Sequence, residues 1–135
     1  MKLFLAGANC KTWCESIYLS NHPNYLTTYF EHQKGFTDKW LYWYKKTSKK
    51  GASWIMDSGF FTMMFGVGKD KTYTEQDLLD YTFKYLNDVK KINYNHYIVE
   101  MDVHKVLGID SLKRFRKIFE SRYDIEKTIY VFHIE

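Results

Sequence analysis

Short apolar segments alternate with amphipathic segments of helical period, and this order constrains the fold more than any other feature of the chain. Four apolar stretches have the length and composition of buried strands: residues 2–7, 53–57, 97–103 and 128–134. Between them lie segments with the pattern of helices. A strand–helix order repeated in this way predicts an α/β fold, a parallel sheet with helical crossovers.

The number and order of the strands distinguish two architectures. Four parallel strands in the order 1-2-3-4 equal half of a (β/α)₈ barrel, because a complete barrel needs about 250 residues. An order 2-1-3-4 would instead indicate an open, doubly wound sheet. Successive crossovers without a sign of reversal favour the half-barrel, spanning residues 1–135 as one domain.

Local signals place the helices and loops between these strands. Cys14 begins a helical pattern that Pro23 ends, and a second helix is expected at about 37–46. Thr74 and Asp77 form a near capping box at the start of a strong helix. Its expected apolar stripe consists of Leu79, Phe83, Leu86 and Val89. Asp110 is the expected N-cap of the last helix, and residues 60–68 are expected to form a glycine-punctuated loop.

Composition excludes several classes of protein. Apolar residues make up 45% of the 135 residues, which excludes a disordered or fibrous chain. No apolar run approaches the roughly 20 residues of a membrane span, so we expect no membrane association. The 2 cysteines cannot form a disulfide framework. Two reduced thiols predict a cytoplasmic protein.

Acidic and polar residues follow the predicted strands at the edge where parallel sheets bind ligands. Asp57, Ser58 and Gly59 follow the second strand, Glu100 and Asp102 lie near the end of the third, and His133 and Glu135 end the fourth. We therefore expect Asp57 and Asp102 to face one another near Ser58, Phe60 and His133. The alternative is structural: Asp57 and Ser58 form an Asx-type turn in which Gly59 supplies a positive φ, and the acids Glu100 and Asp102 form salt bridges to a lysine.

The sequence gives weaker support to two other kinds of chemistry, a metal site and a cysteine nucleophile. Asp57, Asp102 and either His104 or His133 have suitable ligand types for a divalent cation. Their spacing matches no metal motif, so no metal is predicted. Cys14 with a histidine base is weaker still, because nothing in the sequence orients such a pair.

A basic segment offers a second candidate surface. Between Lys34 and Lys50 there are six lysines and one acid, Asp38, with aromatic residues interleaved. Lys45, Lys46, Lys49 and Lys50 could contact phosphates while the aromatic rings stack on bases, which makes nucleic acid a candidate partner. The alternative is an amphipathic helix with a solvated lysine face and an aromatic core face.

The segment from Asp57 to Phe61 resembles the Asp-Ser-Gly-Gly-Phe segment of the tRNA-guanine transglycosylases, with Phe60 at the place of the second glycine. Val99-Glu100-Met101-Asp102 resembles the next acidic strand end of that family. The opening residues 2–7 and the closing residues 131–135 are similar to shorter, phage-borne relatives, some of which modify DNA.

This resemblance implies a barrel enzyme that exchanges a guanine in tRNA or DNA for a 7-deazaguanine. It implies that Asp57 is the acid/base group, that Asp102 binds the purine, and that Ser58, Gly59, Phe60 and His133 surround the base. It also implies that the nucleophile and the zinc-binding cysteines belong to a later half, so we expect a truncated or split form, or a second chain that completes the barrel. No cofactor is expected in this chain.

Two other functions stay open. The opening residues 3–7 also resemble the start of nucleoside deoxyribosyltransferases, which are open α/β enzymes. No glutamate nucleophile of that family can be placed here, and the resemblance does not account for Asp57, Ser58 and Gly59. A non-catalytic nucleic-acid-binding module, built on the lysine–aromatic segment, is the third candidate, and a structural remnant without a site is the last.

Overall fold

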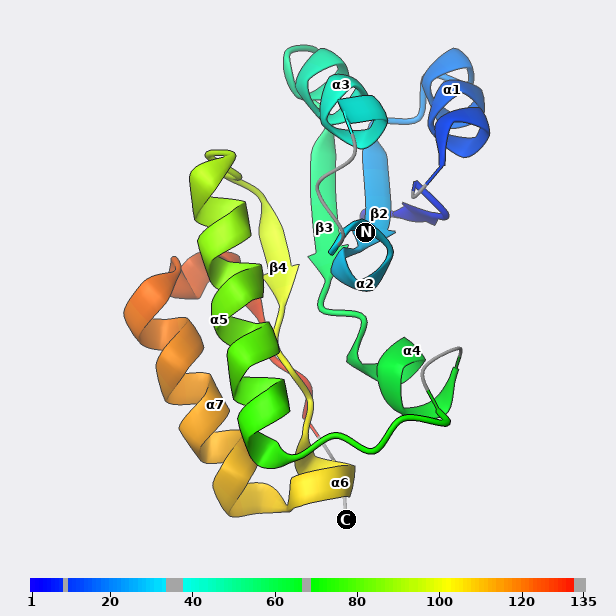
Figure 1. Ribbon diagram of the computed structural model, residues 1–135. Helices are drawn as coiled ribbons and strands as arrows, with labels where there is room; N and C mark the ends of the chain where they lie inside the picture. Colours follow the sequence, from blue (N-terminus) through cyan, green and yellow to red (C-terminus); the bar gives the residue numbers. More distant parts are fainter. Residues whose placement is uncertain (9, 34–37, 67–68, 133–135) are drawn as a thin grey trace.

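The computed structural model describes residues 1–8, 10–33, 38–66 and 69–132. Its strands and helices follow one another along the chain in an α/β order (Figure 1): β1 (Leu5–Ala6), α1 (Lys11–Leu19), β2 (Asn24–Thr28), α2 (Tyr29–His32), α3 (Asp38–Ser48), β3 (Ser53–Asp57), α4 (Phe60–Phe65), α5 (Glu75–Lys91), β4 (Tyr97–Val99), α6 (His104–Leu107), α7 (Ile109–Arg122), the 3₁₀ helix η1 (Ile125–Lys127) and β5 (Thr128–Ile129).

The described strands form one parallel sheet of 5 strands in the sequential order β1-β2-β3-β4-β5. The predicted parallel α/β class and the sequential order are confirmed. The predicted number of strands is wrong, because β2 follows Pro23 in a stretch where the sequence predicted no strand. The strand β3 has the predicted bounds, 53–57, whereas β4 is shorter than expected and ends at Val99, before Glu100 and Asp102.

Burial alternates along the strands, because successive side chains point to opposite faces of a sheet. In β3, Trp54 and Met56 are 0% exposed, and Trp54 packs against Trp40 and Tyr44 of α3. The intervening Ile55 is only half-buried, and so is Leu26, its neighbour in β2. The helices therefore cover one face of the sheet more completely than the other.

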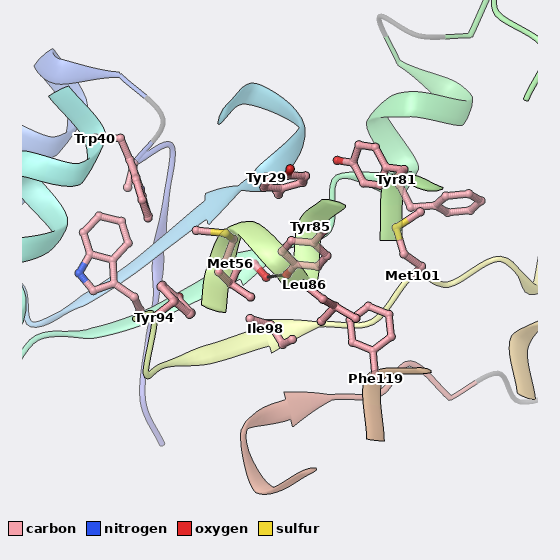
Figure 2. Packing of buried hydrophobic residues seen from close by; sticks show 14 of the residues in the cluster. Tyr29, Trp40, Met56, Tyr81, Tyr85, Leu86, Tyr94, Ile98, Met101 and Phe119 are labelled. Atoms are coloured by element: carbon pink, nitrogen blue, oxygen red, sulfur yellow. Dashed lines mark hydrogen bonds between the residues drawn. The ribbon is translucent and has the colours of Figure 1, made fainter. Parts of the chain in front are cut away.

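Tyrosine supplies much of the core beneath the helices (Figure 2). Tyr29 stacks on Tyr85 with ring centroids 4.7 Å apart. Tyr25 stacks on Trp54 at 4.5 Å. A buried tyrosine needs a partner for its hydroxyl group. Tyr85 donates to the carbonyl of Met56 and Tyr81 donates to the carbonyl of Ser58, each at 2.7 Å. Two residues of α5, four apart, thus hold the end of β3.

The helix that carries these tyrosines begins as predicted, with a capping box between Thr74 and Asp77. Its predicted apolar stripe is wrong in part. Leu86 and Val89 are buried, but Leu79 and Phe83 are only half-buried.

Two further expectations need correction. Residues 60–65 form α4 rather than a loop, and the N-cap of α7 is Gly108, with Asp110 in the first turn. Among the described residues, no helix has the length and apolar character needed to cross a membrane.

One buried histidine predicts how stability responds to acid. His32 is 1% exposed, and a hydrogen bond of 2.7 Å joins its Nε2 to the hydroxyl of Thr27. Burial disfavours the charged imidazole and lowers the pKa of His32 to about 4. In the unfolded chain the pKa is about 6.5, so unfolding takes up a proton between these two values. The stability from neutral His32 is therefore present above about pH 6.5 and is lost as the pH falls through about 4.

We expect this histidine to account for a loss of about 3 kcal/mol in the free energy of unfolding over that range. Urea titrations between about pH 7 and pH 4.5 measure the dependence of stability on pH. His32→Gln removes the titrating group, so its stability should fall less steeply with acid than that of the wild type. Equal slopes for the two proteins would show that His32 does not cause the effect.

Candidate functional site

A pocket of about 470 Å³ lies at the carboxyl ends of β3 and β4. Parallel neighbouring strands end at the same edge of a sheet, so the residues after β3 and those after β4 meet there. In Figure 1 this edge lies where the arrowheads of β3 and β4 point toward α4 and α6. The residues that line the pocket are Asp57, Ser58, Phe60, Phe61, Phe65, Val99, Glu100, Asp102, Lys105 and Val131.

Asp57 and Asp102 therefore line one pocket, as the strand order predicts. Asp57 is the last residue of β3 and is half-buried. Its Oδ1 accepts a hydrogen bond of 2.6 Å from the backbone N–H of Gly59, which fixes the carboxylate in an Asx-type turn. The structural reading of Asp57 is thus correct for one oxygen. The bond leaves Oδ2 without a hydrogen-bond partner among the described residues.

Ser58 and Gly59 build the turn that presents Asp57. Ser58 is 3% exposed and its hydroxyl donates to the carbonyl of Glu100 at 3.1 Å, which ties the end of β3 to the end of β4. Gly59 has φ 77° and does not line the pocket. It precedes α4, the helix that carries the three phenylalanines of the pocket wall. Phe60 is buried, whereas Phe61 and Phe65 are 74% and 52% exposed with ring centroids 5.2 Å apart.

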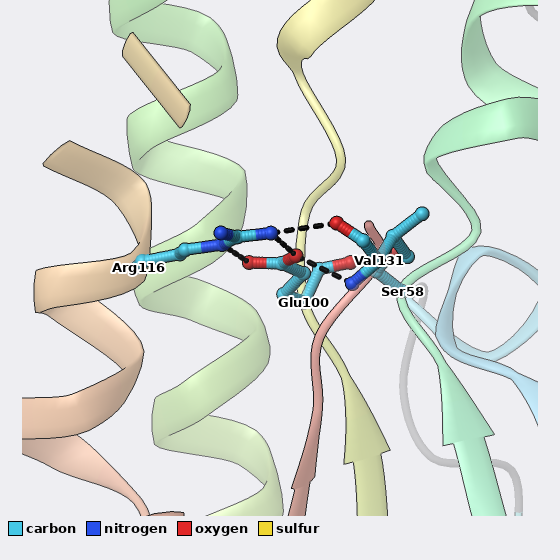
Figure 3. Close-up of polar contacts among 4 residues, drawn as sticks. All are labelled: Ser58, Glu100, Arg116 and Val131. Atoms are coloured by element: carbon cyan, nitrogen blue, oxygen red, sulfur yellow. Dashed lines mark hydrogen bonds and ion pairs between the residues drawn. The ribbon is translucent and has the colours of Figure 1, made fainter. Parts of the chain in front are cut away.

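Glu100 forms the salt bridge of the structural alternative, but with an arginine in place of the expected lysine. Its carboxylate is 1% exposed and accepts two hydrogen bonds of 2.8 Å from Arg116 of α7. Its Oε1 also accepts from the backbone N–H of Val131 at 2.7 Å, and Arg116 donates to the carbonyl of Val131 at 2.6 Å (Figure 3). These bonds to Glu100 raise the pKa of the Arg116 guanidinium. The ion pair of Glu100 and Arg116 thus holds Val131 at the pocket wall.

The remaining predicted residues have different outcomes. His133 and Glu135 lie outside the described residues. Among the described residues, no three His, Cys, Asp or Glu side chains gather closely enough to hold a metal ion. Cys14 is 1% exposed, and burial raises the pKa of its thiol to about 11. A thiol with so high a pKa is protonated near pH 7 and is a poor nucleophile.

The lysine–aromatic segment largely matches the structural alternative, an amphipathic helix with lysines in solvent and aromatic rings in the core. Trp40, Trp43 and Tyr44 lie in the core, so their rings cannot stack on a base, whereas Tyr42 is 55% exposed. Lys45, Lys49 and Lys50 are exposed and Lys46 is half-buried. All four lie before β3, whereas Asp57 ends it. A strand of five residues spans roughly 13 Å, so the lysines and the pocket lie at opposite ends of the sheet.

Sequence reasoning did not find three of the pocket residues that come from helices, namely Phe61, Phe65 and Lys105. The spacing of four between Phe61 and Phe65 is a helical signal, but the nearby glycines led us to expect a loop. Comparison of the chain with protein-family models, with curated proteins and with solved structures found no match. The geometry of the pocket therefore carries the functional argument.

Proposed function

We propose that the pocket at the ends of β3 and β4 binds a purine or 7-deazapurine base, as part of a reaction that exchanges guanine for a 7-deazaguanine in tRNA or DNA. The observation that carries the proposal is that Asp57 and Asp102 line one pocket with three phenylalanines of α4. Aromatic rings offer flat apolar contacts to a heterocycle. Carboxylates accept hydrogen bonds from the N–H groups at the edge of a guanine.

In this reaction the glycosidic bond to the departing base breaks, and that base gains a proton that the incoming base gives up. We assign the proton transfer to Asp57, whose Oδ2 lacks a described partner, and recognition of the base to Asp102. Besides these two, the described carboxylate in the pocket lining is Glu100, which Arg116 engages. The nucleophile is thus assigned to a further part of the barrel, in line with the resemblance.

The strand order of the sheet favours a transglycosylase-like barrel over the open sheet of a deoxyribosyltransferase. The sequential strand order is that of consecutive (β/α) units in a barrel, whereas the open sheet of the alternative would have the order 2-1-3-4. Parallel sheets are normally covered on both faces. The half-buried face that carries Leu26 and Ile55 is the one that would line a barrel interior. Further β/α units, from a second chain or a longer one, would complete it.

Base binding tests the proposal directly. Calorimetric titration with guanine and with 7-deazaguanine should detect binding to the wild type. Asp102→Asn should weaken binding by about 10- to 100-fold, since a hydrogen bond to a charged group contributes roughly 1.5–3 kcal/mol. Asp110→Asn is the matched control, because it makes the same change on the exposed start of α7. A wild type that binds neither base, or equal losses in the two variants, would contradict the proposed function.

A further inference from the structure

Two lysines and a tyrosine form a cationic cluster at the amino ends of the strands, far from the pocket. The ammonium nitrogens of Lys46 and Lys50 each lie 4.5 Å from the ring centroid of Tyr18, which belongs to α1. Lys50 also donates a hydrogen bond of 2.6 Å to the hydroxyl of Tyr18. The two ammonium groups are therefore within about 9 Å of one another, since both lie close to the same ring.

In the part of the chain that the structure describes, no carboxylate lies within 4.0 Å of Lys46 or Lys50. Lys45 and Lys49 add two exposed positive charges on the same stretch. Like charges held this close repel one another, so an anion that binds between them relieves the repulsion. The aromatic contacts restrict both ammonium groups before any ligand arrives, which reduces the entropy cost of binding.

The exposed ring of Tyr42 lies next to the ammonium group of Lys46. Tyr42 is 55% exposed, and the ammonium group of Lys46 lies 5.5 Å from its ring centroid and 3.4 Å from its hydroxyl. Phosphate-binding cations next to an open aromatic face are the combination by which proteins hold single-stranded nucleic acid. We propose that Tyr18, Tyr42, Lys46 and Lys50 form a binding surface for single-stranded nucleic acid, with phosphates on the lysines and a base on Tyr42.

This surface is independent of the purine pocket, because β3 separates the two along its length. Fluorescence anisotropy with a labelled oligothymidylate therefore tests it alone, since thymine is not a purine. Binding should weaken with salt at a log–log slope of about −0.7 for each phosphate contact on a single strand. Lys46→Gln with Lys50→Gln should make the slope shallower by about 1.4. Tyr42→Leu should weaken binding about tenfold, in line with the loss of one stacked base, and leave the slope unchanged.

The control changes two other lysines with the same spacing. Lys113 and Lys117 lie four apart on the exposed face of α7, outside both the pocket and the cluster. Lys113→Gln with Lys117→Gln should leave the slope as it is in the wild type. Three results would overturn the inference: no binding at low salt by folded protein, an equal change of slope in the control, or binding to anionic lipid vesicles without binding to oligothymidylate. Inorganic phosphate should compete only weakly, since it supplies no base for Tyr42.

Discussion

Replacing Glu100 with glutamine should lower the free energy of unfolding by about 3–5 kcal/mol, the largest effect that we expect from a single polar substitution here. The side chain of Glu100 is 1% exposed, and that of Arg116 is 23% exposed. Glutamine keeps the size of the side chain but not its charge, so the guanidinium of Arg116 stays partly buried without a counter-ion. Because some of Arg116 reaches solvent, we expect a value near the lower end of this range.

A double variant distinguishes the effect of the charges from the effect of the volume that the two side chains fill. Glu100→Leu combined with Arg116→Met removes both charges, and a buried pair replaced in this way often costs little. The double variant should therefore be more stable than Glu100→Gln alone. Urea unfolding at neutral pH measures all three proteins. A Glu100→Gln protein within about 0.5 kcal/mol of the wild type would show that the pair does not hold the fold together.

Loss of this pair should also change the pocket. Glu100 and Arg116 both bind the backbone of Val131, and Val131 lines the pocket. The position of Val131 and the shape of the pocket thus depend on the same four hydrogen bonds (Figure 3). The sequence suggested a salt bridge from Glu100 to a lysine, but the partner is an arginine. Arg116 is one of four basic residues in a run on α7, and only the packing of that helix selects it.

The edge of the sheet that holds the pocket was predictable because it follows from topology alone. Once the strands are parallel and sequential, the residues after β3 and β4 must share an edge, wherever the strand boundaries fall. In this way the sequence predicted that Asp57 and Asp102 share an edge, and both line the pocket there. Phe61 and Phe65 were not predicted, since α4 is a short helix whose formation depends on the turn at Gly59 and on packing rather than on a long periodic pattern.

The sequence analysis missed one strand and part of the core for the same reason. Polar side chains can be buried where they are hydrogen-bonded, and their partners are known only from the folded chain. In β2, Asn24 and Thr27 are buried because Asn24 donates to the carbonyl of Leu3 and Thr27 bonds to His32. Hydropathy alone cannot distinguish such a strand from a turn. Tyr81 and Tyr85 likewise occupy the core in place of Leu79 and Phe83 because carbonyls near the end of β3 accept their hydroxyl groups.

Gly59→Ala should destabilise the protein by about 4 kcal/mol, through two separate costs. A residue other than glycine at φ 77° costs roughly 1–3 kcal/mol. A β-carbon at this position would also lie 2.3 Å from Cβ of Phe30 and 2.7 Å from Oγ1 of Thr28. No atoms approach so closely without a shift of the backbone, and overpacking of this kind costs roughly 1–3 kcal/mol more. The strain would fall on the turn that fixes Asp57 and starts α4.

Gly51→Ala is the matched control, because it shares the backbone conformation but not the crowding. Gly51 has φ 80°, and a β-carbon there would meet nothing within 4 Å. The difference in the free energy of unfolding between the two variants therefore measures the close approach of the turn after β3 to β2 and α2. We expect Gly59→Ala to be the less stable of the two by about 2 kcal/mol in urea unfolding. Equal losses would mean that only the positive φ requires glycine, and that Phe30 and Thr28 do not constrain the turn that presents Asp57.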